Sequence, residues 1–467
     1  MHNNKKANGF ALLPLIVFIL IYLGAGLIYQ SLGVEMAFYQ FPIVTAALAG
    51  LVLAFCMGKG SINEKFSVFA KGAGNEDIMT MLIIFALAGA FSNVASIMGG
   101  RDSVVNLGLS FVPVQFLAAG IFVISAFMGT ATGTSMGTIS AIVPIAVGVA
   151  DKGGLNIALV VGACVGGAMF GDNLSMISDT TIAATRSQNC EMKDKFRVNL
   201  LIALPAAIIT VIMLLILGRP ETVTAMGDLS FSFVKVIPYL LVLVLAIIGI
   251  NVFLVLTIGI ISAGIIGLIT GDLTVASYAQ GIWNGITGMS EIFYLSLLMG
   301  GLAALTSHNG GIAWLIEKLR GVMKGNKSAQ VGISSLVSLA DCAVANNTVA
   351  IIVCGNVAKD ISHEYKVDPR RTASLLDVFS CVFQGILPYS AQPLSAAALT
   401  TACGFAMAPV DILPYVWYCG VLAIFGVLSI FIPYADNVCR KDPWNWEYDV
   451  AESGVEAKKK SIAVVAE

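Results

Sequence analysis

Long apolar runs recur along most of the chain, at about the length that an α-helix needs to cross a bilayer. Roughly 20 helical residues cover a hydrocarbon layer of ~30 Å. Eight runs reach or approach this length: 10–27, 41–57, 78–98, 198–217, 237–249, 252–270, 292–306 and 415–433. Two longer stretches, 111–183 and 329–399, are apolar but are repeatedly interrupted by Gly, Pro, Ser, Thr, Asn and Asp. The pattern predicts an all-α polytopic membrane protein with about ten transmembrane helices, plus a re-entrant hairpin or broken helix in each interrupted stretch.

Landmarks in the first half of the chain recur about 210 positions later. The small residues at 88–90 correspond to those at 299–301, and the interrupted stretch 129–150 corresponds to 339–358. The similarity between these segments is weak, so the distribution of charge decides whether it reflects a repeat.

Basic residues separate the two halves by orientation. The segments 58–77, 184–197, 310–328 and 359–371 together hold 15 Lys and Arg, whereas their counterparts in the other half hold only Arg101 and Lys152. Each pair of corresponding loops is opposite in this bias. Since Lys and Arg collect on the cytoplasmic side, the halves are predicted to be inverted repeats, as in many secondary transporters.

The boundaries follow from this reading. We expect a first inverted repeat with a flanking helix over 1–217, a linker over 218–236, a second inverted repeat over 237–435 and a cytoplasmic tail over 436–467. Both termini carry basic residues and are expected in the cytoplasm, which requires an even number of spans.

Composition agrees with a membrane protein and narrows the function. Hydrophobic residues make up 57% of the chain and charged residues 12%, with a mean hydropathy of +0.88. The net charge of −2 gives no reason to expect a nucleic-acid partner. The three histidines are far apart, and neither H-E-x-x-H nor a Ser–His pair at membrane depth occurs. We therefore expect no enzyme activity and no cofactor.

Four carboxylates fall within the predicted membrane region: Asp172, Asp179, Asp341 and Asp377. The predicted spans contain no Lys or Arg, so we expect these carboxylates to lack a basic partner. A carboxylate at membrane depth is costly and by default marks an ion or proton path. A cation from solution is the expected counter-charge.

Hydroxyl-bearing residues gather in a separate segment that precedes these carboxylates in the chain. The Gly-rich segment 129–140 supplies candidate ligands at Thr132, Thr134, Ser135 and Thr138. Unwound backbone and hydroxyl oxygens suit a desolvated alkali cation. A close helix crossing through small residues is the alternative.

The segment 171–181 is the most polar part of this region. Its candidate ion ligands are Asp172, Asn173, Ser175, Ser178, Asp179 and Thr180. The two carboxylates are seven positions apart, which places them on one face of a helix, and they are the candidates for Na⁺. A solvated, capped loop at the end of a span is the alternative.

The second half contributes a corresponding set of polar residues. Its candidates are Asp341, Asn346, Asn347, Thr348, Asp377, Ser390 and Gln392. Interhelical hydrogen bonding is the alternative role for the two asparagines.

Two of these segments resemble signature motifs of NhaC-type sodium/proton antiporters. Residues 132–138 are similar to T-G-T-S-W-G-T, and residues 170–181 to F-G-D-x-x-S-P-L-S-D-T-T. Residues 387–390 resemble the later I-P-W-N segment of that family. The resemblance implies membership of the ion-transporter superfamily, whose members pair inverted repeats and move substrate by an elevator-like shift. It also implies a bacterial inner membrane location, and a homodimer is a candidate assembly.

Two departures from the family motifs leave the cargo open. Met176 replaces a proline, and Asn346-Asn347 stands where an acid followed by glutamine is expected. We expect a sodium/proton antiporter in which Na⁺ and H⁺ compete for Asp172 and Asp179. A sodium-coupled amino-acid or organic-anion transporter, with substrate held at 132–138 and 346–348, is the alternative. A passive channel is disfavoured because it needs no inverted repeats.

Overall fold

The computed structural model describes residues 7–32, 34, 40–111, 113–176, 178–220, 229–248, 250–321 and 323–446. Every regular element in these ranges is a helix. Among the residues that the structure describes, nine helices are long and apolar enough to cross a membrane, or ten if the bent pair Pro409–Tyr415 and Trp417–Phe431 forms one span. The expectation of an all-α polytopic protein with about ten spans is confirmed for this part of the chain.

The first half runs from α1 to α10. Its helices are α1 (Leu13–Ser31), α2 (Ile43–Cys56), α3 (Ile62–Ala73), α4 (Glu76–Ile97), α5 (Gly100–Phe111), α6 (Leu117–Thr132), α7 (Ser135–Gly153), α8 (Ile157–Leu174), α9 (Asp179–Ser187) and α10 (Met192–Leu217). Helix α3 begins with a capping box in which Ser61 and Glu64 each accept the other's backbone N–H.

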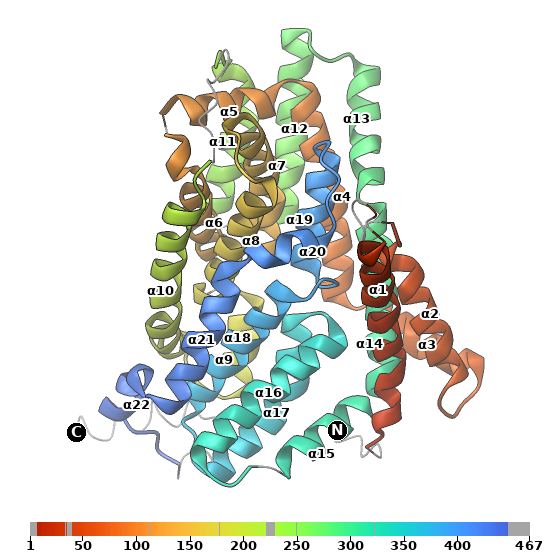
Figure 1. The fold of residues 1–467 in the computed structure, drawn as a ribbon, viewed down its shortest axis with the longest axis vertical. Coiled ribbons are helices and arrows are strands. Elements are labelled where there is room, and N and C mark those ends of the chain that lie inside the picture. Colours follow the sequence, from red (N-terminus) through yellow and green to blue (C-terminus); the bar gives the residue numbers. More distant parts are fainter. Residues whose placement is uncertain are drawn as a thin grey trace, which may run out of the picture.

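The second half runs from α11 to α22. It consists of α11 (Phe233–Ile247), α12 (Val252–Thr270), α13 (Val275–Gly288), α14 (Ser290–His308), α15 (Gly311–Arg320), α16 (Asn326–Val344), α17 (Asn347–Tyr365), α18 (Pro369–Ile386), α19 (Ala391–Ala402), α20 (Pro409–Ile412), α21 (Trp417–Phe431) and α22 (Asn437–Lys441). Helices α4 to α9 correspond in order and approximate length to α14 to α19. In Figure 1 the α6–α7 pair lies above the α16–α17 pair, whereas α19 lies above α9.

Several segments expected to be loops are helical. The region 271–290 contains α13, and the regions 99–110 and 310–328 contain α5 and α15. The distribution of charge did not indicate that these segments fold as helices. The helix that begins before 198 is more consequential, because α10 starts at Met192 and takes three basic residues with it.

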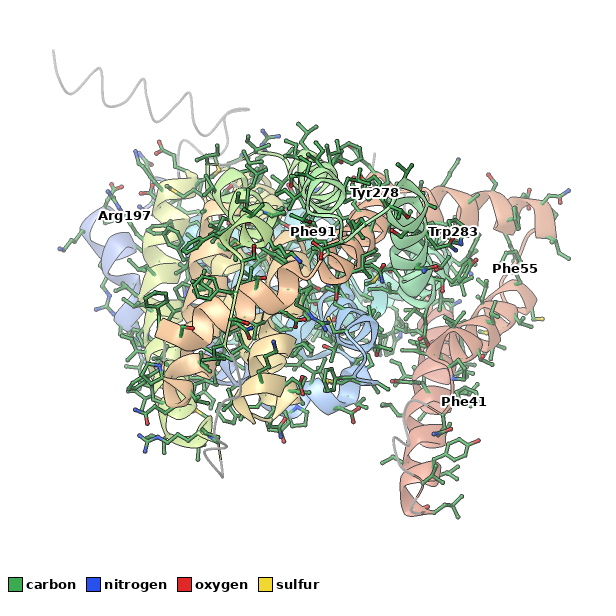
Figure 2. The ribbon with its side chains drawn as sticks, turned by 90° about the horizontal axis from the view of Figure 1, so that it is seen from above. Phe41, Phe55, Phe91, Arg197, Tyr278 and Trp283 are labelled. Atoms are coloured by element: carbon green, nitrogen blue, oxygen red, sulfur yellow. The ribbon has the colours of Figure 1, made fainter. Side chains whose placement is uncertain are left out.

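The helices divide into a buried centre and a periphery. In the most apolar 18-residue stretch of Ile157–Ser187, 89% of the residues are buried. In the corresponding stretch of Met192–Leu217, 33% are buried. Figure 2 shows α1–α3, with Phe41 and Phe55, beside the main bundle, and Arg197 at the opposite edge. The polar motifs therefore lie on the most enclosed helices.

Candidate functional site

The two interrupted stretches each form a helical hairpin. In the first, Val114 lies just before α6 and Gly153 is the last residue of α7. A Cβ atom added to Gly153 would lie 3.3 Å from the Val114 side chain, so α6 and α7 are antiparallel. In the second, the Asn326 side-chain amide at the start of α16 donates to the Lys366 carbonyl just after α17, at 2.8 Å. A hairpin in each half was the expectation, and the positions of the breaks match it.

The hairpin tips share one local design. Gly133 and Ala345 have φ of +70° and +53°, the left-handed conformation that ends a helix. The next residues, Thr134 and Asn346, cap the following helices by accepting backbone N–H groups at 3.3 Å and 3.0 Å. The Gly-rich and Asn-rich motifs therefore encode two tight turns between helices.

Two interrupted helices pack against these tips. α8 and α9 together span Ile157–Ser187, and α18 and α19 span Pro369–Ala402. At the breaks, side-chain hydroxyl groups donate hydrogen bonds to backbone carbonyl oxygens. Thr181 Oγ1 donates to the Ser175 carbonyl at 2.7 Å, and Ser390 Oγ donates to the Gln384 and Leu387 carbonyls at 2.5 Å and 2.8 Å. These hydrogen bonds stabilise the two broken helices.

The tips and the breaks surround a cavity of about 260 Å³. None of the side chains that line it is basic. They are Glu76, Thr80, Ile84, Thr134, Ser135, Met136, Asp172, Asp179, Thr180, Asn346, Asn347, Thr348, Gln384 and Gln392, together with Gly133. Nine of the residues singled out in the sequence thus lie on one wall or another of a single cavity.

A chain of hydrogen bonds crosses this cavity from one half of the protein to the other. Ser135 Oγ donates to Asp172 Oδ2 at 2.8 Å, and Gln392 Nε2 donates to Ser135 Oγ at 3.1 Å. Gln384 Nε2 donates to Gln392 Oε1 at 2.7 Å and to the Ala345 carbonyl at 3.4 Å. Both hairpin tips and both broken helices are therefore linked through side chains that line this cavity.

Asp179 occupies the first turn of α9, directly after the Ser178 cap. Its carboxylate lies within electrostatic range of Asp172. Asp179 accepts no hydrogen bond among the described residues, whereas Asp172 accepts one from Ser135. The cavity therefore holds both of these carboxylates, of which Asp172 is held by a hydrogen bond.

Asp377 does not line the cavity, and the expectation that it lacks a basic partner is wrong. Its side chain is fully buried and forms an ion pair with Lys195, which is 1% exposed. Asn173 and Asn199 donate to the same Asp377 oxygen at 3.1 Å and 2.8 Å. The Lys195 ammonium also donates to the Asn173 carbonyl and to Thr181 Oγ1, at 2.9 Å and 2.8 Å. Asp377 therefore belongs to a neutral internal cluster that holds the α8–α9 break against α18.

Asp341 also lies away from the cavity. It is fully buried on α16, and neither of its carboxylate oxygens has a hydrogen-bond partner among the described residues. Its electrostatic neighbours are Cys342, Cys354 and Tyr389. The predicted role of Asp341 as a direct ligand is thus not what the cavity geometry favours.

The remaining predicted residues support the fold around the site. Thr138 Oγ1 donates to the Thr134 carbonyl at 2.9 Å, and Ser178 caps α9. Thr132, Asn173, Ser175 and Ser390 do not line the cavity. Gly129 and Gly171 serve helix packing, since a Cβ on Gly171 would lie 2.5 Å from the Gly129 backbone. The start of the first motif, at Gly129, therefore forms a close helix crossing, which was the alternative reading. Its later part, at Thr134 and Ser135, lines the cavity.

Five polar residues in or beside the site were not among the predicted ones: Glu76, Thr80, Lys195, Asn199 and Gln384. Gln384 follows Asp377 by seven positions, so helical spacing could have placed it near the site. Lys195 was assigned to a loop because it sits among basic residues. The absence of any helix breaker between Met192 and the apolar run was the signal that α10 begins earlier.

Comparison with known proteins supports the resemblance seen in the motifs. The model of the Na⁺/H⁺ antiporter family matches residues 3–219. The chain is 24% identical to the malate-2H⁺/Na⁺-lactate antiporter of Bacillus subtilis, over 91% of this chain and 97% of that protein. It is 24% identical to the Na⁺/H⁺ antiporter NhaC of the same organism, over 75% of this chain and 83% of that protein.

A third relative covers a shorter stretch at higher identity. The Na⁺/H⁺ antiporter NhaC of Alkalihalophilus pseudofirmus is 29% identical over 44% of this chain and 47% of that protein. Among solved structures, the Alcanivorax borkumensis YdaH transporter aligns with a TM-score of 0.40 at 11% identity, over 92% of this chain and 100% of that chain. On its motifs and these sequence matches, the chain is similar to Na⁺/H⁺ antiporters, and its residues 3–219 match the model of that family.

Proposed function

We propose that the protein exchanges sodium ions for protons, and that both bind at Asp172 and Asp179. The observation that carries this is the cavity itself, in which carboxylate, hydroxyl and amide oxygens face a space that no basic side chain lines. Oxygen atoms are the ligands that hard cations take. A carboxylate that holds a proton cannot hold Na⁺ at the same oxygen, so one site couples the two fluxes.

The charge balance of the buried region fits this function. Lys195 and Asp377 cancel each other, which leaves Asp172 and Asp179, together with the exposed Glu76, as the carboxylates that line the cavity without a basic partner there. Either Na⁺ or H⁺ supplies their counter-charge. The internal pair thereby keeps Asp377 from acting as a further ion site.

Alternating access follows from an inverted-repeat arrangement. Two observations support such an arrangement. Helices α4–α9 and α14–α19 follow one another in the same order, and in Figure 1 α6–α7 lie above α16–α17 whereas α9 lies below α19. In this proposal α6–α9 and α16–α19 move together, because the hydrogen-bond chain from Asp172 to Ala345 joins them. An elevator-like shift of this unit would expose one cavity to each side in turn.

Sodium binding at stepped pH tests the site. Deprotonation frees the carboxylates, so the apparent Na⁺ affinity of the purified protein should increase as pH rises. Asp172→Asn with Asp179→Asn should bind Na⁺ weakly at every pH. Undiminished, pH-independent Na⁺ binding by that double variant would contradict the proposal.

A second candidate, sodium-coupled exchange of an organic anion or amino acid, rests on polar atoms left without partners. Asn347 Nδ2 and Gln384 Oε1 are buried at the cavity and make no hydrogen bond among the described residues. Asn347 Nδ2 can donate to a substrate carboxylate, and Gln384 Oε1 can accept from a substrate ammonium or hydroxyl group. Such a pair suits an organic anion or zwitterion better than it suits a proton. A relative named for malate and lactate exchange supports including it. Substrate-dependent Na⁺ uptake in proteoliposomes, abolished by Asn347→Ala, would favour this candidate.

A further inference from the structure

A second polar cavity lies at the far end of α18, away from the ion site. Its volume is about 260 Å³, and it is formed by the start of α16, the end of α17, the start of α18 and the segment around α22. The segment 359–371, with its four basic residues, contributes to its wall. The positive-inside rule places this cavity at the cytoplasmic side.

Arg371 is the buried charge of this cavity. Its side chain is 2% exposed. Nε donates to Gln330 Oε1 at 3.1 Å, and Nη2 donates to Ser429 Oγ at 2.5 Å. Nη1 has no hydrogen-bond partner among the described residues, although Asp436 Oδ1 lies 3.7 Å from Nε. A guanidinium with one unused edge is a ready donor for an anion.

The other charges leave this cavity electropositive. Two carboxylates line it, Asp368 and Asp436. Asp368 forms an ion pair with Arg370. The Arg370 Nη2 donates to Asp368 Oδ2 at 2.7 Å, and its Nε donates to Asp368 Oδ1 at 2.9 Å. Lys366 and Arg440 also line the cavity, and neither forms an ion pair among the described residues.

Tryptophans complete the site. Lys366 Nζ lies 4.6 Å from the ring centre of Trp446, and the Arg370 guanidinium lies 5.7 Å from that of Trp444. Trp is enriched where a membrane protein meets the polar headgroups. The Trp446 ring thus holds Lys366 at the cavity without neutralising its charge.

We propose that this cavity binds a phosphate-bearing anion, with Arg371, Lys366 and Arg440 as its donors. Planar guanidinium groups match phosphate oxygens in pairs, and basic pockets between transmembrane helices bind anionic headgroups. The phosphate can come from an anionic phospholipid or from solution. Its place at the start of α18, the helix that carries Asp377 and Gln384, would let it fix that helix.

Thermal unfolding of the detergent-purified protein tests the proposal. Dioctanoyl-phosphatidylglycerol, dioctanoyl-phosphatidylcholine and inorganic phosphate would be titrated separately. Lys366→Gln with Arg440→Gln removes two exposed donors and leaves Arg371 in place. With about 1 kcal/mol for each basic residue, its half-saturating concentration for the effective anion should rise roughly 30-fold.

Lys318→Gln with Lys324→Gln is the matched control, since it removes two basic residues outside this cavity. It should respond like the wild type. Saturable stabilisation by phosphatidylglycerol alone identifies a lipid headgroup, and equal stabilisation by inorganic phosphate identifies a soluble anion. Equal effects of phosphatidylglycerol and phosphatidylcholine without any effect of phosphate, or an unchanged response of the Lys366/Arg440 variant, would overturn the proposal.

Discussion

Lys195 on α10 and Asp377 on α18 form an ion pair in the buried centre of the protein. The Lys195 ammonium also bonds to both sides of the break between α8 and α9, through the Asn173 carbonyl and Thr181. One side chain therefore neutralises a membrane carboxylate and fixes the broken helix that presents Asp172 and Asp179.

Removing Lys195 alone should be strongly destabilising. Lys195→Met leaves Asp377 buried without its counter-charge, and the loss of one partner of a buried pair costs about 3–5 kcal/mol. Lys195→Met with Asp377→Asn removes both charges and should recover much of that loss. Thermal unfolding of the two variants measures the difference. A double variant no more stable than the single one would show that the pair is not coupled in this way.

Ser135 should tune the ion site without holding the fold. Ser135→Ala removes the hydrogen bond to Asp172, and a bond to a charged group contributes about 1.5–3 kcal/mol. The apparent KM for Na⁺ should therefore rise by roughly tenfold or more. Ser140→Ala is the control, since the Ser140 hydroxyl lies on the same helix and has no hydrogen-bond partner among the described residues. Equal KM values for the two variants would count against a role of Ser135 in ion binding.

Gly171 should tolerate no side chain. A Cβ at this position would lie 2.5 Å from the backbone of Gly129, so Gly171→Ala must push α8 away from α6. Overpacking of this kind costs about 1–3 kcal/mol. Gly120→Ala on α6 meets no atom within 4 Å and should leave the unfolding temperature nearly unchanged. Similar unfolding temperatures for the two variants would contradict the close approach of α6 and α8.

Orientation is open to a direct test. The basic segment around α3 is predicted in the cytoplasm and the segment around α13 outside. Lys71→Cys and Ala276→Cys, each in a background with reactive native thiols removed, should differ in labelling by an impermeant maleimide on intact cells. Only the Cys at position 276 should react. Labelling of both would remove the support that charge gives to inverted repeats.

The sequence indicated the helical breaks because glycine, hydroxyl and amide residues in an apolar run have few other roles at membrane depth. It also brought out Asp172 and Asp179 as a pair. It did not indicate that Lys195 lies in a span, since a basic residue near a span end reads as cytoplasmic whether its side chain points outward or into the bundle. Asp341 and Asp377 were grouped with the site for their charge alone, and only packing separates them from it.

Proton movement in proteoliposomes tests the central claim most directly. Vesicles loaded with Na⁺ and diluted into Na⁺-free buffer, with no organic compound present, should acidify inside as Na⁺ leaves and protons enter. Asp179→Asn should purify normally and show no such acidification, because its amide can no longer alternate between Na⁺ and a proton. A wild-type protein that takes up Na⁺ only with an organic substrate, and never moves protons between pH values of about 6 and 9, would contradict the account.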